Sequence, residues 1–174
     1  MVPTLDDAEA RQAYGMLHLS AAMAAAAQSD RDTATTHLNE AAAIADRLDE
    51  EVGTFGRAYF GRTNVGIWRV SIGVELGDGG RVAEIARDIR VDAIPSPSRQ
   101  ANFFADLGRA LISDKATREQ GLALLLRAEK LAPQLIRNDL FVREAVGNAL
   151  RSARRAAGGQ ELRGLAYRLG LAPS

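Results

Sequence analysis

The segment Thr63-Asn64-Val65-Gly66-Ile67-Trp68-Arg69-Val70-Ser71-Ile72-Gly73-Val74-Glu75-Leu76-Gly77-Asp78 decides the fold. Over 70–75 apolar residues alternate with small or polar ones, which is also the pattern of a strand. Helical spacing fits equally well and gives two apolar faces: Val65, Trp68 and Ile72 on one, and Ile67, Val70 and Val74 on the other. Helical hairpin patterns flank the segment, so a lone strand would have nothing to pair with. We therefore predict a helix over 63–76, buried on two faces.

Outside this segment, helical periodicity covers most of the remaining chain. The glycines of 77–80 supply the positive φ that helix C-terminal caps favour. Asp30 or Asp32 is placed to cap a second helix, and Ser96 or Ser98 a later one. The second helix carries the cleanest apolar stripe, at Ala34, Leu38, Ala41, Ala45 and Leu48. The other predicted helices cover 6–27, 81–88, 98–112, 116–132 (ended by Pro133), 139–156 and 160–170.

Residues 49–62 form the longest stretch without helical periodicity, and three glycines and three aromatic residues gather there. An aromatic-rich loop is expected to pack onto the core, because exposed apolar patches are unfavourable. The alternative is that the loop lines a pocket.

One hairpin matches the tetratricopeptide pattern of two helices that cross at a small residue. Its positions are Leu107-Gly108, Leu111, a turn at Asp114-Lys115, Gly121, Ala128, Leu131 and Pro133. The first hairpin repeats the pattern weakly through Ala34 and Ala41, and the second through Val74, Gly77-Asp78 and Ala83. We predict an all-α chain: a tetratricopeptide-like α-α superhelix of about three to four degenerate hairpins, forming one domain over 1–174. An ordinary helical bundle is the alternative.

The composition argues against two classes of partner, nucleic acids and membranes. The 22 basic and 22 acidic residues cancel, whereas nucleic-acid binding usually needs a basic excess, so we expect no nucleic acid contact by this chain. A local patch at Arg151, Arg154 and Arg155 is the alternative, with a solvated helix face favoured. No apolar run approaches the ~20 residues that span a bilayer, and the N-terminus is acidic where a secretory signal is basic. We expect a cytoplasmic protein without membrane contact.

No catalytic constellation stands out. The chain has no cysteine and two histidines, His18 and His37, which fall on different predicted helices without a partner at metal-ligand spacing. Each is expected to be partly exposed or hydrogen-bonded at a helix interface. The glycines of 77–81 lack the Lys-Ser/Thr of a phosphate loop, and the carboxylates of 49–51 fit a solvated loop. We predict a non-enzyme with no metal and no cofactor.

Three stretches carry a family resemblance: Gly15-Met16-Leu17-His18-Leu19 through Thr63-Asn64-Val65, then Arg69-Val70-Ser71 to Asp78, and Leu131-Ala132-Pro133. Over about residues 13–171 the chain resembles the C-terminal half of Xre-type, lambda-repressor-like transcription regulators of high-GC Gram-positive bacteria. The resemblance implies a tetratricopeptide-like effector and dimerisation module. No residues match the family's DNA-binding domain, and a histidine that members often carry is Trp68 here. The chain is expected to be either an excised effector module or a stand-alone protein.

The repeat register turns the first helix of each hairpin toward a concave groove, which we predict to bind a peptide, protein or small-molecule effector. The candidate residues are His18, Asn64, Trp68, Ile72, Glu75, Asn102 and Arg109. Trp68 has a competing interpretation, in which it simply packs between hairpins. Two functions stay open: the sensing half of a transcription regulator, expected to be a homodimer, and an adaptor that docks a protein partner.

Overall fold

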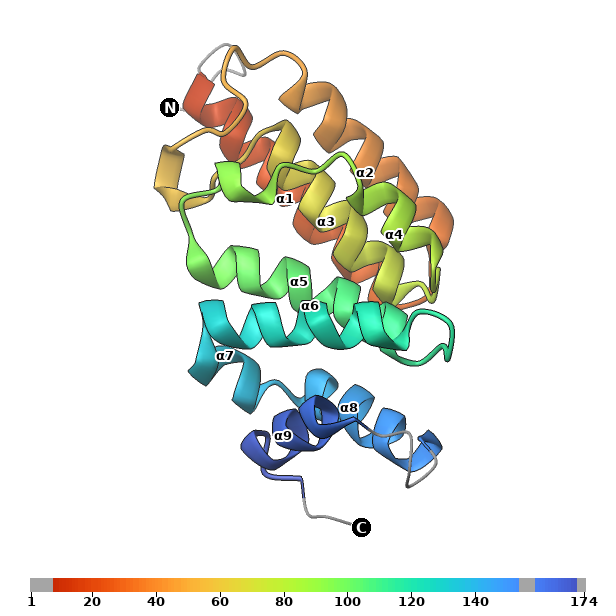
Figure 1. Ribbon diagram of the computed structural model, residues 1–174. Helices are drawn as coiled ribbons and strands as arrows, with labels where there is room; N and C mark the ends of the chain where they lie inside the picture. Colours follow the sequence, from red (N-terminus) through yellow and green to blue (C-terminus); the bar gives the residue numbers. More distant parts are fainter. Residues whose placement is uncertain (1–7, 154–158, 172–174) are drawn as a thin grey trace. The chain divides into compact units, whose positions relative to one another are not determined.

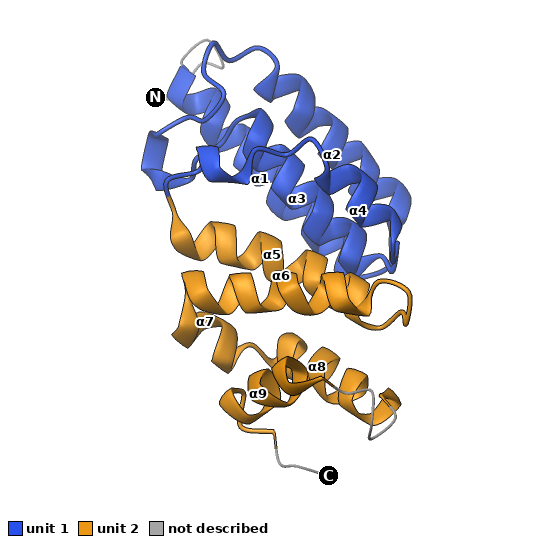
Figure 2. Ribbon diagram, viewed as in Figure 1, with its two compact units in different colours: residues 1–95 blue, residues 96–174 orange. Residues whose placement is uncertain are grey.

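The computed structural model describes residues 8–153 and 159–171, and within them every regular element is helical. This part of the chain holds nine α-helices and two short 3₁₀ turns, and it holds no strand; their arrangement is drawn in Figure 1. The strand alternative for 70–75 is therefore wrong, and the all-α prediction is confirmed. The helices fall into two compact units, residues 1–95 and 96–174 (Figure 2).

The described part of the first unit holds four α-helices. They are α1 (Ala8–Ala27), α2 (Arg31–Ala45), α3 (Arg62–Glu75) and α4 (Arg81–Ala86), with 3₁₀ turns η1 (Phe55–Arg57) and η2 (Val91–Ala93). Helices α1 and α2 form a tight hairpin, and α3 packs against both (Figure 1). Asp30 caps α2 by accepting a hydrogen bond from the Thr33 amide at 3.0 Å, which resolves the predicted choice between Asp30 and Asp32.

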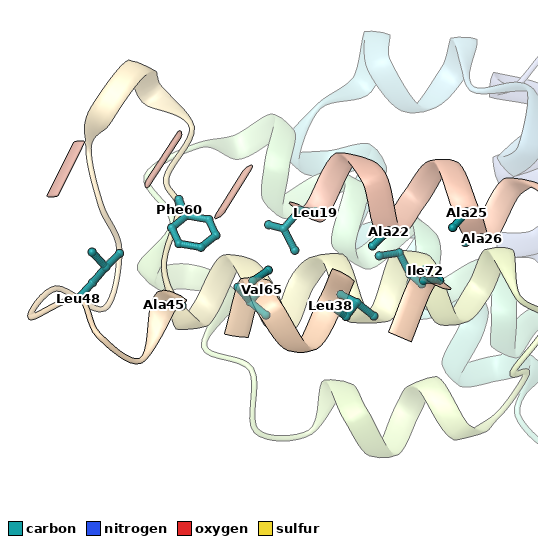
Figure 3. Close-up of a cluster of buried hydrophobic side chains, with 12 residues drawn as sticks. Leu19, Ala22, Ala25, Ala26, Leu38, Ala45, Leu48, Phe60, Val65 and Ile72 are labelled. Carbon is teal, nitrogen blue, oxygen red and sulfur yellow. The ribbon is translucent and has the colours of Figure 1, made fainter. Parts of the chain in front are cut away.

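The core of this unit is unusually rich in alanine on the faces that α1 and α2 turn to each other. Figure 3 shows the cluster, whose members are Leu19, Ala22, Ala25, Ala26, Ala34, Leu38, Ala41, Ala45, Leu48, Phe60, Val65 and Ile72. Small side chains let two helix backbones approach closely, and the larger ones from α3 and the loop fill the remaining space. The predicted stripe of the second helix is confirmed as its buried face, although α2 itself ends at Ala45, before Leu48.

Helix α3 ends as its sequence predicts. Gly77 has φ 74°, and the amides of Gly77 and Asp78 donate to the carbonyls of Val74 and Gly73 at 3.1 and 2.8 Å. These are the paired hydrogen bonds of a glycine-terminated helix. Arg31, at the start of α2, reaches the same end: it donates to the Leu76 carbonyl at 3.1 Å and pairs with Asp78 at 2.8 Å.

The loop between α2 and α3 is held against α1, as expected for an aromatic-rich segment. Phe60 is fully buried, and its ring occupies the space where a side chain on Gly15 would lie. Gln12 of α1 accepts a hydrogen bond from the Phe55 amide at 3.1 Å. Asn64 donates to the Ala58 carbonyl at 2.9 Å. The loop is thus held by α1 at Phe55 and by α3 at Ala58.

The described part of the second unit holds five α-helices: α5 (Pro97–Ile112), α6 (Arg118–Leu131), α7 (Pro133–Asn138), α8 (Leu140–Ser152) and α9 (Gln160–Arg168). Ser96 caps α5, accepting from the Arg99 amide, and Pro97 begins the helix one residue earlier than predicted. Pro133 does end the preceding helix, but it also starts α7, a short helix that the sequence did not predict. Proline suits a first helical position, where no amide is needed. The last residues of the predicted 139–156 helix lie outside the described residues.

Helices α5 and α6 cross at Gly108 and Gly121. A Cβ on Gly121 would lie 2.5 Å from the Ile112 amide nitrogen and 2.9 Å from the Gly108 carbonyl oxygen. A Cβ on Gly108 would lie 2.8 Å from Leu125 Cγ. The predicted close contact at Gly121 is therefore confirmed, and it is a contact between backbones.

Glu129 ties three helices of this unit together. It is almost fully buried on α6 and accepts hydrogen bonds from Arg168 of α9 at 2.7 and 2.8 Å and from Arg137 of α7 at 2.9 Å. These charge-assisted hydrogen bonds hold the pKa of the Glu129 carboxyl below its ordinary value of 4.5. The hydrogen bonds from Arg168 lower this pKa most, and burial acts in the opposite direction.

We expect Gly121→Ala to lower the free energy of unfolding by about 1–3 kcal/mol, because the new methyl group meets backbone that cannot move aside. The matched control is Gly147→Ala in α8, where a Cβ meets only the end of the Arg151 side chain, at 3.4 Å. That variant should gain up to about 1 kcal/mol from helix propensity. Urea unfolding measures both, and equal effects of the two substitutions would contradict the close crossing.

We expect Glu129→Gln to cost about 1–3 kcal/mol at neutral pH, because two arginines lose their carboxylate partner. The folded-state pKa of Glu129 is lowered, so its contribution is present above the ordinary carboxylate range and is lost as the pH falls through the folded-state pKa. Urea unfolding at several pH values should show this acid-dependent loss in the wild type and a smaller one in the variant. Glu119→Gln, at an exposed position of α6, is the control. An unchanged pH profile in Glu129→Gln would refute the assignment.

Candidate functional site

Two of the predicted groove residues are buried in the first unit. Asn64 is 0% exposed, and its side-chain amide donates to the Ala58 carbonyl and contacts Met16 Sδ at 3.7 Å. Ile72 is 1% exposed and belongs to the core cluster (Figure 3). Both side chains have structural contacts and present almost no surface to a ligand.

Trp68 packs against the edge of the same cluster and is half-buried. Its indole Nε1 is buried and has no hydrogen-bond partner among the described residues. The packing favours the interpretation that Trp68 lies between helices.

The other groove candidates differ among themselves. Glu75 in the first unit and Asn102 in the second are exposed. Arg109 is half-buried, pairs with Asp106 at 2.6 Å, and lies over the ring of Phe141 with its guanidinium carbon 5.1 Å from the centroid. Its contact with Phe141 joins α5 to α8. The groove itself stays a prediction, since its residues are divided between the two units.

The first hairpin brings together two residues that the sequence left apart. His18 of α1 and His37 of α2 lie with their Nδ1 atoms 2.9 Å apart, and the two rings are tilted by 52°. One Nδ1 must carry the proton and the other accept it, since two bare nitrogens repel each other at this distance. Tyr14 contacts the His18 ring edge-on, with the centroids 4.7 Å apart. We expected each histidine to be partly exposed or hydrogen-bonded at a helix interface, and both alternatives hold: each ring is half-buried, and the other histidine is its partner.

The pair opens onto the surface. A pocket of about 240 Å³ is lined by Tyr14, Leu17, His18, Ala21 and His37, none of which bears a carboxylate or a lysine or arginine cation. Leu17 is 65% exposed and Tyr14 43% exposed. An aromatic and an aliphatic side chain beside a pair of imidazoles can hold a small ligand by apolar contact and a few hydrogen bonds.

Sequence reasoning placed only His18 in a binding site. The sequence feature that could have predicted the contact between His18 and His37 is the short turn of the hairpin, since α1 ends at Ala27 and α2 begins at Arg31. In antiparallel helices joined by so short a turn, residues at similar distances from the turn lie at the same level.

A second pocket, of about 420 Å³, lies on the second unit. It is lined by Leu140, Arg143, Glu144, Gly147, Arg151 and Leu171. Of the predicted arginine patch, Arg151 donates to Asn148, and Arg154 and Arg155 lie outside the described residues. The described part of the chain contains no group of three or more acidic, histidine or cysteine side chains arranged to hold a metal ion.

Comparison with known proteins gives no relative: no family model, no curated protein and no solved structure matches this chain.

Among the described residues, no helix is both long enough and apolar enough to cross a membrane.

Replacing Trp68 separates its two interpretations. If it packs between helices, Trp68→Ala should cost about 2–4 kcal/mol of unfolding free energy, because it leaves a cavity. Trp68→Phe should cost under about 1.5 kcal/mol, since it keeps the ring and removes a buried N–H without a partner. Urea unfolding followed by circular dichroism measures both. Full stability of the alanine variant would instead indicate an exposed, groove-lining tryptophan.

Proposed function

We propose that this chain is a non-catalytic effector-binding and dimerisation module of a bacterial transcription regulator. The observation that carries the proposal is the pocket beside His18 and His37, where Tyr14 and Leu17 are exposed next to two imidazoles on a well-packed hairpin. Exposed apolar side chains around a few polar groups are typical of a binding surface.

The fold proposed with this function is a tetratricopeptide-like superhelix of about three to four degenerate hairpins. It is supported by the tight pairing of α1 with α2 and of α5 with α6, and by the glycine crossing of the second pair. Such scaffolds place small residues where helices cross, and the curvature of the stacked hairpins gives a concave surface that binds partners.

The resemblance to the C-terminal half of Xre-type regulators supplies the regulatory part of the proposal. In that role an effector would bind between α1 and α2 and favour one packing of the hairpins over another, shifting the population between two states. The effector class is a peptide, a protein segment or a small molecule, and the active form is a cytoplasmic homodimer. DNA contact is assigned to a separate domain.

The experiment tests whether the chain dimerises and so allows a fused DNA-binding domain to bind its operator. The full chain is fused behind a lambda-repressor-like DNA-binding domain that binds its palindromic operator only as a dimer, and repression of a reporter is measured. We expect repression by the fusion and none by the DNA-binding domain alone, because two half-sites must be held together. Analytical ultracentrifugation of the unfused chain should give the mass of two chains.

A chain that stays monomeric at all concentrations, with a fusion that does not repress, would contradict the regulator proposal. That result favours the alternative function, an adaptor that docks a protein partner and needs no second copy.

A further inference from the structure

We propose that His18 and His37 chelate one divalent transition-metal cation, Cu²⁺ or Ni²⁺, through their Nδ1 atoms at the pocket of the first hairpin. The proposal does not depend on the regulatory function. It rests on the distance between the two nitrogens, on the open pocket that both histidines line and on the chemistry of imidazole.

The distance fits two neighbouring positions of one coordination sphere. Bonds of about 2.0–2.1 Å from a metal to each nitrogen, with the nitrogens 2.9 Å apart, give an angle at the metal of about 90°. Square-planar and octahedral ions take that angle, which points to Cu²⁺ or Ni²⁺. Tetrahedral Zn²⁺ would require the nitrogens to separate to about 3.3 Å.

The proton that the rings share is what the metal would replace. In the hydrogen bond one nitrogen points at the other, whereas chelation needs both lone pairs to turn toward a common point. Rotation about the terminal side-chain bonds achieves this, and such bonds have broad torsional preferences. Both rings are half-buried at the edge of an open pocket, so neither is locked by full burial.

The site is open on its remaining sides. Its lining offers no carboxylate, so the ion would carry two protein ligands and complete its coordination with water or with a donor from a bound molecule. Neutral imidazole is a ligand that Cu²⁺ and Ni²⁺ both accept, and the affinity order of divalent ions places Cu²⁺ above Ni²⁺ and Zn²⁺. The neighbouring Leu17 and Ala21 supply an apolar wall and no competing donor.

The first test is calorimetric titration of the full chain, free of any histidine tag, with CuCl₂, NiCl₂ and ZnCl₂ in a weakly coordinating buffer. We expect one equivalent of Cu²⁺ per chain, bound more tightly than Zn²⁺. His18→Asn and His37→Asn should each weaken Cu²⁺ binding by about tenfold or more, since each removes one of two ligands. Leu17→Ala is the matched control: it lines the same pocket, carries no donor, and should bind Cu²⁺ as the wild type does.

Electron paramagnetic resonance of the Cu²⁺ complex identifies the ligands directly. We expect coupling to two imidazole nitrogens in the wild type and to one in each single variant. Circular dichroism establishes that the variants are folded. Unchanged stoichiometry and affinity in the double variant, or no one-to-one binding by the wild type, would overturn the proposal.

A measurement on the wild type alone keeps the proposal testable if a variant does not fold. The chain has only two histidines, so its imidazole ring protons give a simple nuclear magnetic resonance spectrum. Substoichiometric Ni²⁺ should broaden the ring signals of both histidines together, before any others. Broadening of neither, or of one alone, contradicts a shared ion.

Discussion

The structure depends on small residues at the places where its elements pack most closely. In the second unit, Gly121 lies against the Ile112 amide and the Gly108 carbonyl, and any side chain there would overlap them. In the first unit, Gly15 makes room for the ring of Phe60, and alanines fill the interface of α1 and α2. Small residues thus set how near the helices lie, and larger side chains fill what remains.

The same sequence features that set this spacing made much of the fold predictable. Periodicity predicted most of the helices, and Gly77 and Gly121 marked a helix end and a crossing that the structure confirms. The short α7 was missed because a proline was taken only as a terminator, although it also suits a helix start. The loop could not be derived: Tyr59 has a left-handed backbone, φ 53°, that its type does not favour, and the loop is held by Gln12 from a distant helix.

The candidate site was less predictable than the fold, for a physical reason. Assigning residues to a groove from a repeat register assumes that each position faces the way an ideal repeat would face it. Asn64 and Ile72 instead point into the core, where the loop and α1 cover them. The histidine pair depends on how two helices are aligned along each other, which the hairpin turn fixes and a single helix's periodicity does not. Close packing of α1 on α2 therefore creates the one feature with evident ligand chemistry in the described part of the first unit.

The most direct test of this account is the long-range ¹H–¹⁵N spectrum of the two imidazoles at neutral pH. If α1 and α2 hold His18 and His37 with their Nδ1 atoms 2.9 Å apart, one ring must carry its proton on Nδ1 and the other must have a bare Nδ1 that accepts it. The account predicts these unlike Nδ1 states, together with proton contacts between the rings. Two rings that both carry the proton on Nε2, without contacts between them, would contradict the packing of the hairpin and the site built on it.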